Sequence, residues 1–264
     1  MATGLTTAQR RRLADEGFCI VPDVLDGDGV REAKRRLADA AEESARRGWR
    51  TRFPELDPND RNVRVFHLLE HDPLFRELIV HPRALAAVRA LLGDDVRISN
   101  FTANIARPGS GSMFVHSDLA LVAPEPWTEP GSVNVIWCLD PLREDNGATR
   151  YLPGSHRLAR AADVPVDAVD RMVSFAAPAG ALLVMDGRLW HTSGRNRTRD
   201  EDRALLFAYY SRSAIPPQAD WRRDLSPATH AALTPGLAAL LEPDAPLRPR
   251  AGAENHDAAG GRHP

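Results

Sequence analysis

Near residue 95 the sequence changes from apolar residues at helical spacing to short apolar segments separated by turn-forming residues. Short segments bounded by Gly, Pro, Asn or Asp are typical of β-strands. Strands are expected at residues 96–106, 114–121, 133–139, 149–152, 172–175, 181–185 and 203–210. Seven or eight short strands fit a double-sheet jelly roll. The second half of the chain is therefore predicted to form an all-β core.

The first part of the chain predicts helices that flank this core. Thr6 and Gln9 fit a capping box for a short helix that stops at Gly17. Residues 18–21 then predict a strand, and residues 49–64 predict a loop because they are polar and contain two prolines. The helices are expected at residues 6–17, 26–48, 72–79 and 82–92. The fold class is thus an all-β core with flanking helices.

A chain of 264 residues is long enough for one large domain with a sizeable buried core. We assign residues 1–242 to a single jelly-roll domain with N-terminal helices. Residues 243–264 are rich in Pro, Ala, Gly and charge, and are expected to be a disordered tail. No internal repeat interrupts the pattern.

Composition excludes several classes of partner. The formal net charge of -2 and the pI near 6.5 give no reason to expect nucleic acid or an anionic membrane. No run approaches the roughly 20 apolar residues that a membrane span requires. The N-terminus lacks the apolar stretch of a signal peptide, and Cys19 and Cys138 lie in apolar segments typical of reduced core residues. A cytoplasmic protein is expected, and its oligomeric state is left open.

His116 and Asp118 are the first candidates for chemistry. In an extended strand, residues two apart project to the same side, so an imidazole and a carboxylate converge. His191, at a short segment ending in a small-residue turn, supplies a third donor. Two imidazoles and one carboxylate leave coordination positions open, which favours iron(II) used with oxygen over a closed zinc site. The H-x-D pattern alone is weak, because chance produces it in many chains.

Arg203 opens an apolar segment that predicts a buried strand. A buried arginine needs an anionic partner, and its planar fork suits a carboxylate. The alternative is a surface arginine at the start of a strand, which is the commoner situation.

These segments together resemble the phytanoyl-CoA dioxygenase family of iron(II)- and 2-oxoglutarate-dependent oxygenases. The family pattern is H-x-D, then a distal histidine with an S-G-x-N turn, then an arginine. It is met by His116, Asp118, His191, residues 193–196 and Arg203. Residues 145–156 also resemble the family's N-G-x-x-x-x-x-P-G-S-H stretch. The resemblance covers roughly residues 12–212 and implies a double-stranded β-helix with the metal between its sheets.

The resemblance also implies roles for individual residues. His116, Asp118 and His191 would be the metal ligands and the catalytic centre. Arg203 would bind the distal carboxylate of 2-oxoglutarate, with hydroxyl contacts from Thr149 and Ser193. Met113 and Trp190 stand where the family places further co-substrate or substrate contacts. The cofactors implied are Fe(II), 2-oxoglutarate and O2.

The implied reaction converts 2-oxoglutarate into succinate and CO2 and removes hydrogen from a substrate carbon. Hydroxylation is the usual outcome, and desaturation, cyclisation and epimerisation are also open. Asp118 argues against halogenation, because related halogenases carry a small residue at that position. One alternative is a cupin-like metal-dependent isomerase or hydrolase that does not use 2-oxoglutarate. Another is a non-catalytic binding module with a vestigial site.

The substrate is expected to be a small molecule, and candidate contacts can be named. Residues 124–131 follow the H-x-D segment and contain Trp127, so this stretch is either a lid or a rigid connection. Arginines are scattered rather than clustered for CoA phosphates, which favours a small or polycyclic natural-product intermediate. The candidate contacts are Asn104, Trp127, Trp137 and Arg188. Further possible pocket residues, equally compatible with core packing, are Phe101, Phe114, Asn134 and Tyr209.

Overall fold

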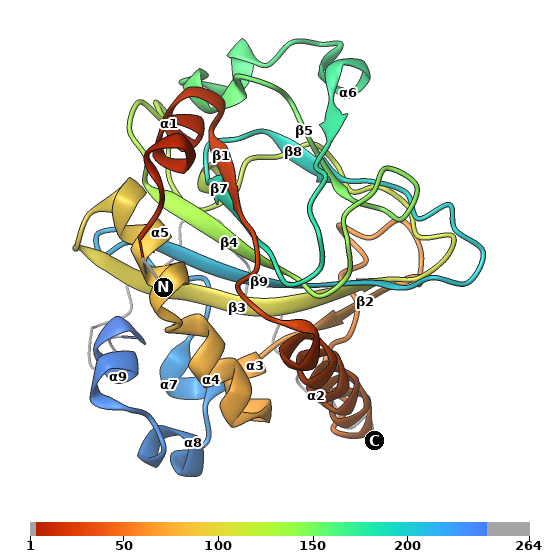
Figure 1. The fold of residues 1–264 in the computed structure, drawn as a ribbon, viewed down its shortest axis with the longest axis vertical. Helices are drawn as coiled ribbons and strands as arrows, with labels where there is room; N and C mark the ends of the chain where they lie inside the picture. Colours follow the sequence, from red (N-terminus) through yellow and green to blue (C-terminus); the bar gives the residue numbers. More distant parts are fainter. Residues whose placement is uncertain (1–3, 242–264) are drawn as a thin grey trace, which may run out of the picture.

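The computed structural model describes residues 4–241, and its centre is a pair of antiparallel sheets (Figure 1). The large sheet has the strand order β1-β7-β4-β9-β3-β2, and the small sheet has the order β6-β5-β8. The strands are β1 Phe18–Val21, β2 Asn62–Val65, β3 Val96–Ala106, β4 Ser132–Cys138, β5 Thr149–Tyr151, β6 Val173–Ser174, β7 Leu182–Asp186, β8 His191–Ser193 and β9 Arg203–Arg212. This is the jelly roll with flanking helices that the sequence predicts. The expected tail, residues 243–264, lies outside the described residues.

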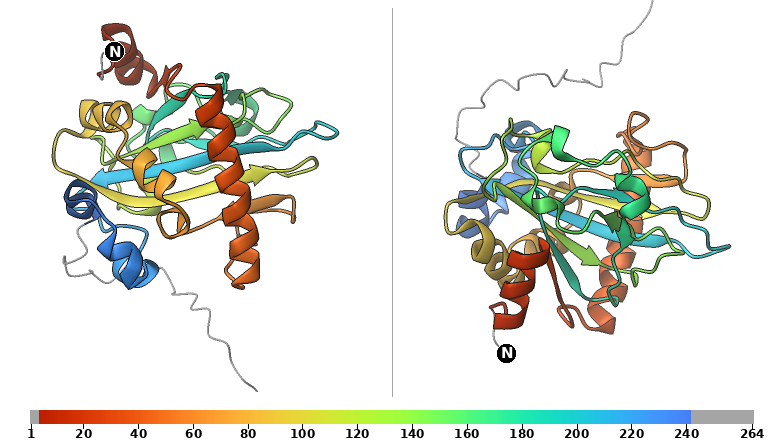
Figure 2. Two further views of the ribbon diagram at one scale, coloured as in Figure 1. Left: turned by 60° about the horizontal axis from the view of Figure 1, so that its bottom comes forward. Right: turned by 90° about the horizontal axis from the view of Figure 1, so that it is seen from above.

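Most of the helices cover the face of the large sheet that is turned away from the small sheet, whereas α6 (Ala168–Arg171) lies against the small sheet, where its Val169 carbonyl accepts a hydrogen bond from Arg150 of β5. Their bounds are α1 Thr7–Glu16, α2 Gly27–Arg46, α3 Leu68–His71, α4 Pro73–Ile79, α5 Pro82–Leu92, α6 Ala168–Arg171, α7 Trp221–Asp224, α8 Pro227–Ala231 and α9 Pro235–Leu241. Figure 2 shows α2 crossing this face. Apolar residues of α2, α4, α5 and α9 share one core with alternate residues of the large sheet. Within the described residues, no helix is both long and apolar enough to cross a membrane.

Alternation along the strands decides which residues face the small sheet. On β4, Val133, Val135 and Trp137 belong to the helix-side core, whereas Ile136 and Cys138 belong to the core between the sheets. The same alternation on β9 directs Leu205 between the sheets and Leu206 toward the helices. Residues of these central strands that project to the same side as Ile136, Cys138 and Leu205 can therefore reach a site between the sheets.

The helix starts agree with the expected caps. The Thr6 hydroxyl accepts a hydrogen bond from the Gln9 backbone N–H, and the Gln9 side chain accepts one from the Thr6 N–H. Gly17 follows α1 with a φ of 79°, and a Cβ there would meet the His156 ring at 2.7 Å. Glycine is therefore required both by the backbone conformation and by close packing.

Two expected elements differ in the structure. Residues 114–121 do not form a strand, because the backbone turns into the helical region at Asp118 and Leu119–Leu121 forms a 3-10 helix. The Ser117 hydroxyl accepts a hydrogen bond from the Ala120 N–H and so stabilises this turn. Residues 49–64 are not only a loop, since β2 begins at Asn62 and pairs with β3 as an edge strand.

Neither cysteine should react with iodoacetamide in the folded protein. Cys19 and Cys138 are buried free thiols, and burial raises the pKa of each to about 12. At about pH 8 both therefore stay protonated, whereas the thiolate is the reactive form. Mass spectrometry should find no alkylation under native conditions and two alkylated sites in denaturant. Rapid native labelling of either residue would contradict the burial of these strands.

Candidate metal centre

Backbone pairing brings His116 and His191 together. The His116 N–H donates to the His191 carbonyl at 3.0 Å, and the His191 N–H donates to the His116 carbonyl at 2.8 Å. Their ring centroids are 4.4 Å apart. One oxygen of Asp118 lies 3.9 Å from the His116 Nε2 and 3.7 Å from the His191 Nε2. His116 and Asp118 thus converge with His191, which is distant in the sequence, and the donor atoms of the three side chains lie within 4.8 Å of one another.

Backbone carbonyls orient both imidazoles. The His116 Nδ1 lies 3.0 Å from the Phe114 carbonyl oxygen, and the His191 Nδ1 lies 2.9 Å from that of Leu189. A carbonyl only accepts, so each Nδ1 carries the proton and each Nε2 keeps a free lone pair. In this tautomer the Nε2 atoms can bind a metal, while the carbonyls hold the imidazole rings in place through the Nδ1 hydrogen bonds.

Asp118 is held by the two central strands of the large sheet. Asn134 on β4 donates through Nδ2 to the Asp118 Oδ2 at 3.0 Å, and the Tyr209 hydroxyl on β9 donates to the Asp118 carbonyl at 3.1 Å. Asn134 and Tyr209 are direct partners in the strand register. The Asn134 bond occupies one carboxylate oxygen, and the other oxygen is the one that faces the two histidines.

Burial sets the protonation of His116 and Tyr209. It lowers the pKa of His116 to about 4, with a further lowering by His191 that Asp118 partly opposes. His116 is therefore neutral near neutral pH and can donate its lone pair. Burial also raises the pKa of Tyr209 well above its usual value, so its hydroxyl remains a hydrogen-bond donor.

The donor set fits iron(II). Two imidazole nitrogens and one carboxylate oxygen form the set that leaves positions open for further ligands, unlike the four-ligand set of structural zinc. The thiols do not join this cluster, because no cysteine is among the residues that converge. A mononuclear metal with open positions is the chemistry that these three side chains can support.

Arg203 lies at the start of β9 and is 1% exposed. One guanidinium nitrogen, Nη2, donates to the Gly147 carbonyl at 2.9 Å, whereas Nε and Nη1 have no partner among the described residues. Burial lowers its pKa to about 10, which leaves it protonated near neutral pH. A buried charge without a counter-ion is costly, so this site fits an anion such as a carboxylate.

The two hydroxyl residues expected beside Arg203 are neighbours in the small sheet. Thr149 on β5 is the direct partner of Ser193 on β8, and Ser193 is two residues from His191 and so shares its face. The Met113 N–H donates to the Ser193 Oγ at 3.0 Å, and Thr192 donates to the Met113 carbonyl at 2.6 Å. Because Ser193 accepts from Met113, its hydroxyl proton is free for another partner.

The prediction that Trp137 contacts the substrate is wrong, because its side chain lies on the helix side of the large sheet. Asn134 points toward Asp118, so Trp137, three residues further along the same strand, points to the opposite face. It is fully buried in the helix-side core, with its ring 5.5 Å from that of His81. The large sheet separates it from the histidines.

The other three candidates are placed differently. Trp127 is packed down, with its indole N–H donating to the Ala123 carbonyl at 2.9 Å and its ring 6.2 Å from Trp190. Arg188 pairs with buried Asp186 and donates to the Thr128 carbonyl, so it ties the Trp127 segment to the end of β7. Asn104 is buried on β3 and is the direct partner of Leu205, so its side chain projects into the space between the two sheets.

Together, the jelly roll, the two histidines with Asp118, and the buried unpaired arginine define a non-haem iron, 2-oxoglutarate-dependent dioxygenase. Residues 13–204 match the family described as Phytanoyl-CoA dioxygenase (PhyH). The chain belongs to this family, as its sequence motifs predict. Iron(II), 2-oxoglutarate and O2 are accordingly its cofactor and co-substrates.

Relatives and solved structures agree with this class. The chain is 48% identical over 229 residues to the dioxygenase af480 of Aspergillus fumigatus, covering 87% of this chain and 74% of that protein. HygX from Streptomyces hygroscopicus, solved with nickel, 2-oxoglutarate and hygromycin B, matches 79% of this chain and 88% of its own at 20% identity and a TM-score of 0.64. SnoN, an epimerase from nogalamycin biosynthesis, matches 80% of this chain and 84% of its own chain, at 21% identity and a TM-score of 0.62. At such identity these two structures share the fold.

Proposed function

We propose that His116, Asp118 and His191 are the iron(II) ligands and that Arg203, with Thr149 and Ser193, binds 2-oxoglutarate. The observation that carries this assignment is the pairing of a converged three-donor set with a buried guanidinium that lacks a carboxylate partner. The triad would hold the keto-acid end, and Arg203 would hold the distal carboxylate.

Each residue then has a defined task. Iron(II) with 2-oxoglutarate and O2 would supply the oxidant for a substrate C–H bond, with release of succinate and CO2. Arg203 fixes the far end of the co-substrate through charge-assisted hydrogen bonds, and the Ser193 hydroxyl is free to add one more. Asn134 and Tyr209 keep Asp118 in place, so the reacting groups need little rearrangement.

We infer that the reaction is hydroxylation of a small natural-product intermediate, or desaturation, cyclisation or epimerisation of one. The names of similar proteins support this class, since SnoN is called an epimerase from nogalamycin biosynthesis and HygX was solved with hygromycin B bound. The retained Asp118 argues against halogenation. A metal-dependent isomerase or hydrolase that does not use 2-oxoglutarate would supply no carboxylate to pair with the buried charge of Arg203.

Asn134→Ala should weaken metal binding by about 10- to 100-fold, the usual loss when a supporting hydrogen bond to a metal ligand is removed. The variant removes the donor to the Asp118 Oδ2 but keeps all three ligands. Calorimetric titration with nickel(II) would measure the change. Asn104→Ala, on β3, which β9 separates from β4 in the large sheet, is the matched control and should bind nickel normally. Equal affinities for all three proteins would remove Asn134 from the centre.

The proposed function is tested by supplying the iron(II)-loaded protein with 2-oxoglutarate, oxygen and a library of polycyclic metabolites. At least one compound should stimulate succinate release and yield a product heavier by one oxygen atom, lighter by two hydrogens, or epimerised. Mass spectrometry and NMR would identify the product. Succinate release without any compound-dependent stimulation across such a library would count against a natural-product substrate.

A further inference from the structure

A carboxylate outside the proposed co-substrate site holds the start of β9. The pairing of β4 with β9 ends at Cys138 and Leu205. Two residues further along the chain, the Asp140 Oδ2 accepts a hydrogen bond from the Ala204 N–H at 2.9 Å, so a side chain continues the ladder where β4 has ended. Because Ala204 directly follows Arg203, Asp140 fixes the backbone from which the proposed co-substrate arginine extends.

The guanidinium of Arg203 is held by the same loop, residues 139–148. Its Nη2 donates to the Gly147 carbonyl at 2.9 Å. The Asn146 Nδ2 donates to the Pro141 carbonyl at 2.7 Å and so joins the two ends of the loop. The backbone and the side chain of Arg203 therefore both depend on this one loop.

The charge of Asp140 also acts on Arg203. Burial lowers the pKa of Arg203, and the nearby Cys138 and Asp140 side chains oppose this lowering. Within residues 4–241, Asp140 makes no hydrogen bond to the guanidinium, so Nε and Nη1 stay free for a ligand. A bare carboxylate so near the arginine would, however, repel an anionic ligand.

Lys34 on α2 neutralises this carboxylate. Its Nζ lies 2.7 Å from the Asp140 Oδ1, so each oxygen of Asp140 has one partner, the ammonium outside and the Ala204 N–H inside. The side chain of Lys34 is 45% exposed and therefore open to reagents in solution. It is the only lysine of the sequence, so an amine reagent has a single lysine target.

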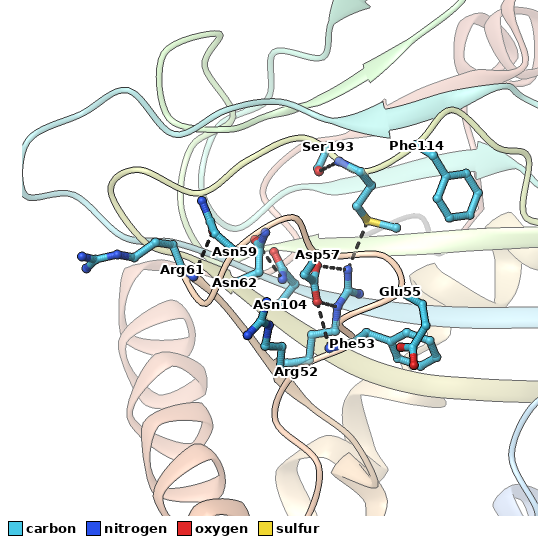
Figure 3. Close-up of polar contacts among 12 residues, drawn as sticks. Arg52, Phe53, Glu55, Asp57, Asn59, Arg61, Asn62, Asn104, Phe114 and Ser193 are labelled. Carbon is cyan, nitrogen blue, oxygen red and sulfur yellow. Dashed lines mark hydrogen bonds and ion pairs between the residues drawn. The ribbon is translucent and has the colours of Figure 1, made fainter. Parts of the chain in front are cut away.

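The other proposed contact to the distal carboxylate is held independently of this ion pair. Ser193 accepts the Met113 N–H at 3.0 Å, a contact that Figure 3 shows. Ser193 lies on β8 of the small sheet, whereas Asp140 follows β4 of the large sheet. A change at Asp140 should therefore alter Arg203 and leave Ser193 in place.

We propose that Asp140 is a positioning residue for 2-oxoglutarate, with Lys34 as its partner. The inference rests on the proposed function, in which Arg203 binds the distal carboxylate. The hydrogen bond to Ala204 holds the guanidinium in the orientation that this carboxylate needs, so less ordering is required on binding. Lys34 offsets the repulsion between Asp140 and the co-substrate.

The test compares 2-oxoglutarate with 2-oxopentanoate, which has the same chain length but no distal carboxylate. Anaerobic titration of the iron(II)-loaded protein, followed by visible absorption, gives both dissociation constants. Asp140→Ala should weaken 2-oxoglutarate binding by about tenfold and leave 2-oxopentanoate binding unchanged, because the metal-binding end is untouched. Asp140→Asn keeps an acceptor for the Ala204 N–H and should bind 2-oxoglutarate within about threefold of the unmodified protein.

Lys34 supplies an independent test at the surface. Lys34→Met should weaken 2-oxoglutarate binding by about threefold, whereas Lys34→Arg keeps the charge and should bind normally. Acetylation by an N-hydroxysuccinimide ester, in which the acetyl group moves to the amine nitrogen and N-hydroxysuccinimide leaves, should reproduce the Lys34→Met value. Asp39→Ala is the matched control, because Asp39 is an exposed carboxylate that pairs with Arg35 on the same helix.

An unchanged 2-oxoglutarate affinity in Asp140→Ala, or equal weakening of both compounds, overturns the inference. Tighter binding of 2-oxoglutarate also overturns it, because that is the result if only the negative charge of Asp140 mattered. If Asp140→Ala does not fold, as judged by its melting temperature, the Lys34 variants decide, and equal affinities in Lys34→Met and Lys34→Arg overturn the inference. An unmodified protein that binds both compounds equally would instead overturn the proposed function of Arg203.

Discussion

Asp118→Ala is expected to abolish 2-oxoglutarate turnover and to weaken iron(II) binding by more than about 100-fold, the upper loss for a mere supporting residue. The substitution removes the carboxylate that faces both imidazoles and leaves only two ligands. It also leaves the Asn134 amide without its acceptor, at a cost of about 1–3 kcal/mol, which a folded domain tolerates. Succinate release and iron titration measure the two effects.

Asp145→Ala is a suitable control for this variant, because Asp145 is an exposed carboxylate paired with Arg143 on the surface. It should bind iron and release succinate like the unmodified protein. Circular dichroism should show that both variants fold. Substantial turnover by a folded Asp118→Ala protein would mean that the triad is not the metal centre.

Arg203→Met should raise the 2-oxoglutarate concentration needed for half-maximal turnover by about 100-fold or more. Two charge-assisted hydrogen bonds of about 1.5 kcal/mol or more each would be lost, and 1.4 kcal/mol corresponds to a factor of ten. Methionine fills the buried space without a charge, so the fold should be kept or slightly stabilised, because Nε and Nη1 no longer lie buried without partners. Succinate release against 2-oxoglutarate concentration measures the shift.

Arg212→Met tests whether the effect is local. Arg212 ends the same strand β9 and donates to the Pro130 carbonyl, far along the strand from Arg203. Its half-saturation concentration should match that of the unmodified protein. An unchanged 2-oxoglutarate requirement in Arg203→Met would remove this arginine from the co-substrate site.

The sequence predicts the jelly roll and the convergence of the triad, although it predicts the wrong backbone conformation around His116 and Asp118. The expected strand around His116 is a single β-bridge to His191 followed by a turn at Asp118. The two side chains still meet, because the turn begins at Asp118 itself. Spacing and residue type were therefore sufficient for the site but not for the local backbone.

Contacts across the sheets could not be predicted, because they depend on strand register. The sequence predicts Trp137 as a pocket residue, but the alternation of side chains along β4 directs it to the helix side of the large sheet. Asn134 and Tyr209 were only general pocket candidates, and their link to Asp118 follows from their pairing on adjacent strands. The edge strand β2 was missed because its first residues lie in a polar, proline-containing segment that predicts only a loop.

Anaerobic titration of the iron(II)-loaded protein with 2-oxoglutarate, followed by visible absorption, tests the central assignment most directly. We expect a charge-transfer band that saturates at one 2-oxoglutarate per iron, needs much more co-substrate in Arg203→Met, and is absent in Asp118→Ala. A protein that binds iron but develops no band, or a band that is unchanged in Asp118→Ala, would contradict the assignment of His116, Asp118 and His191 as the iron site.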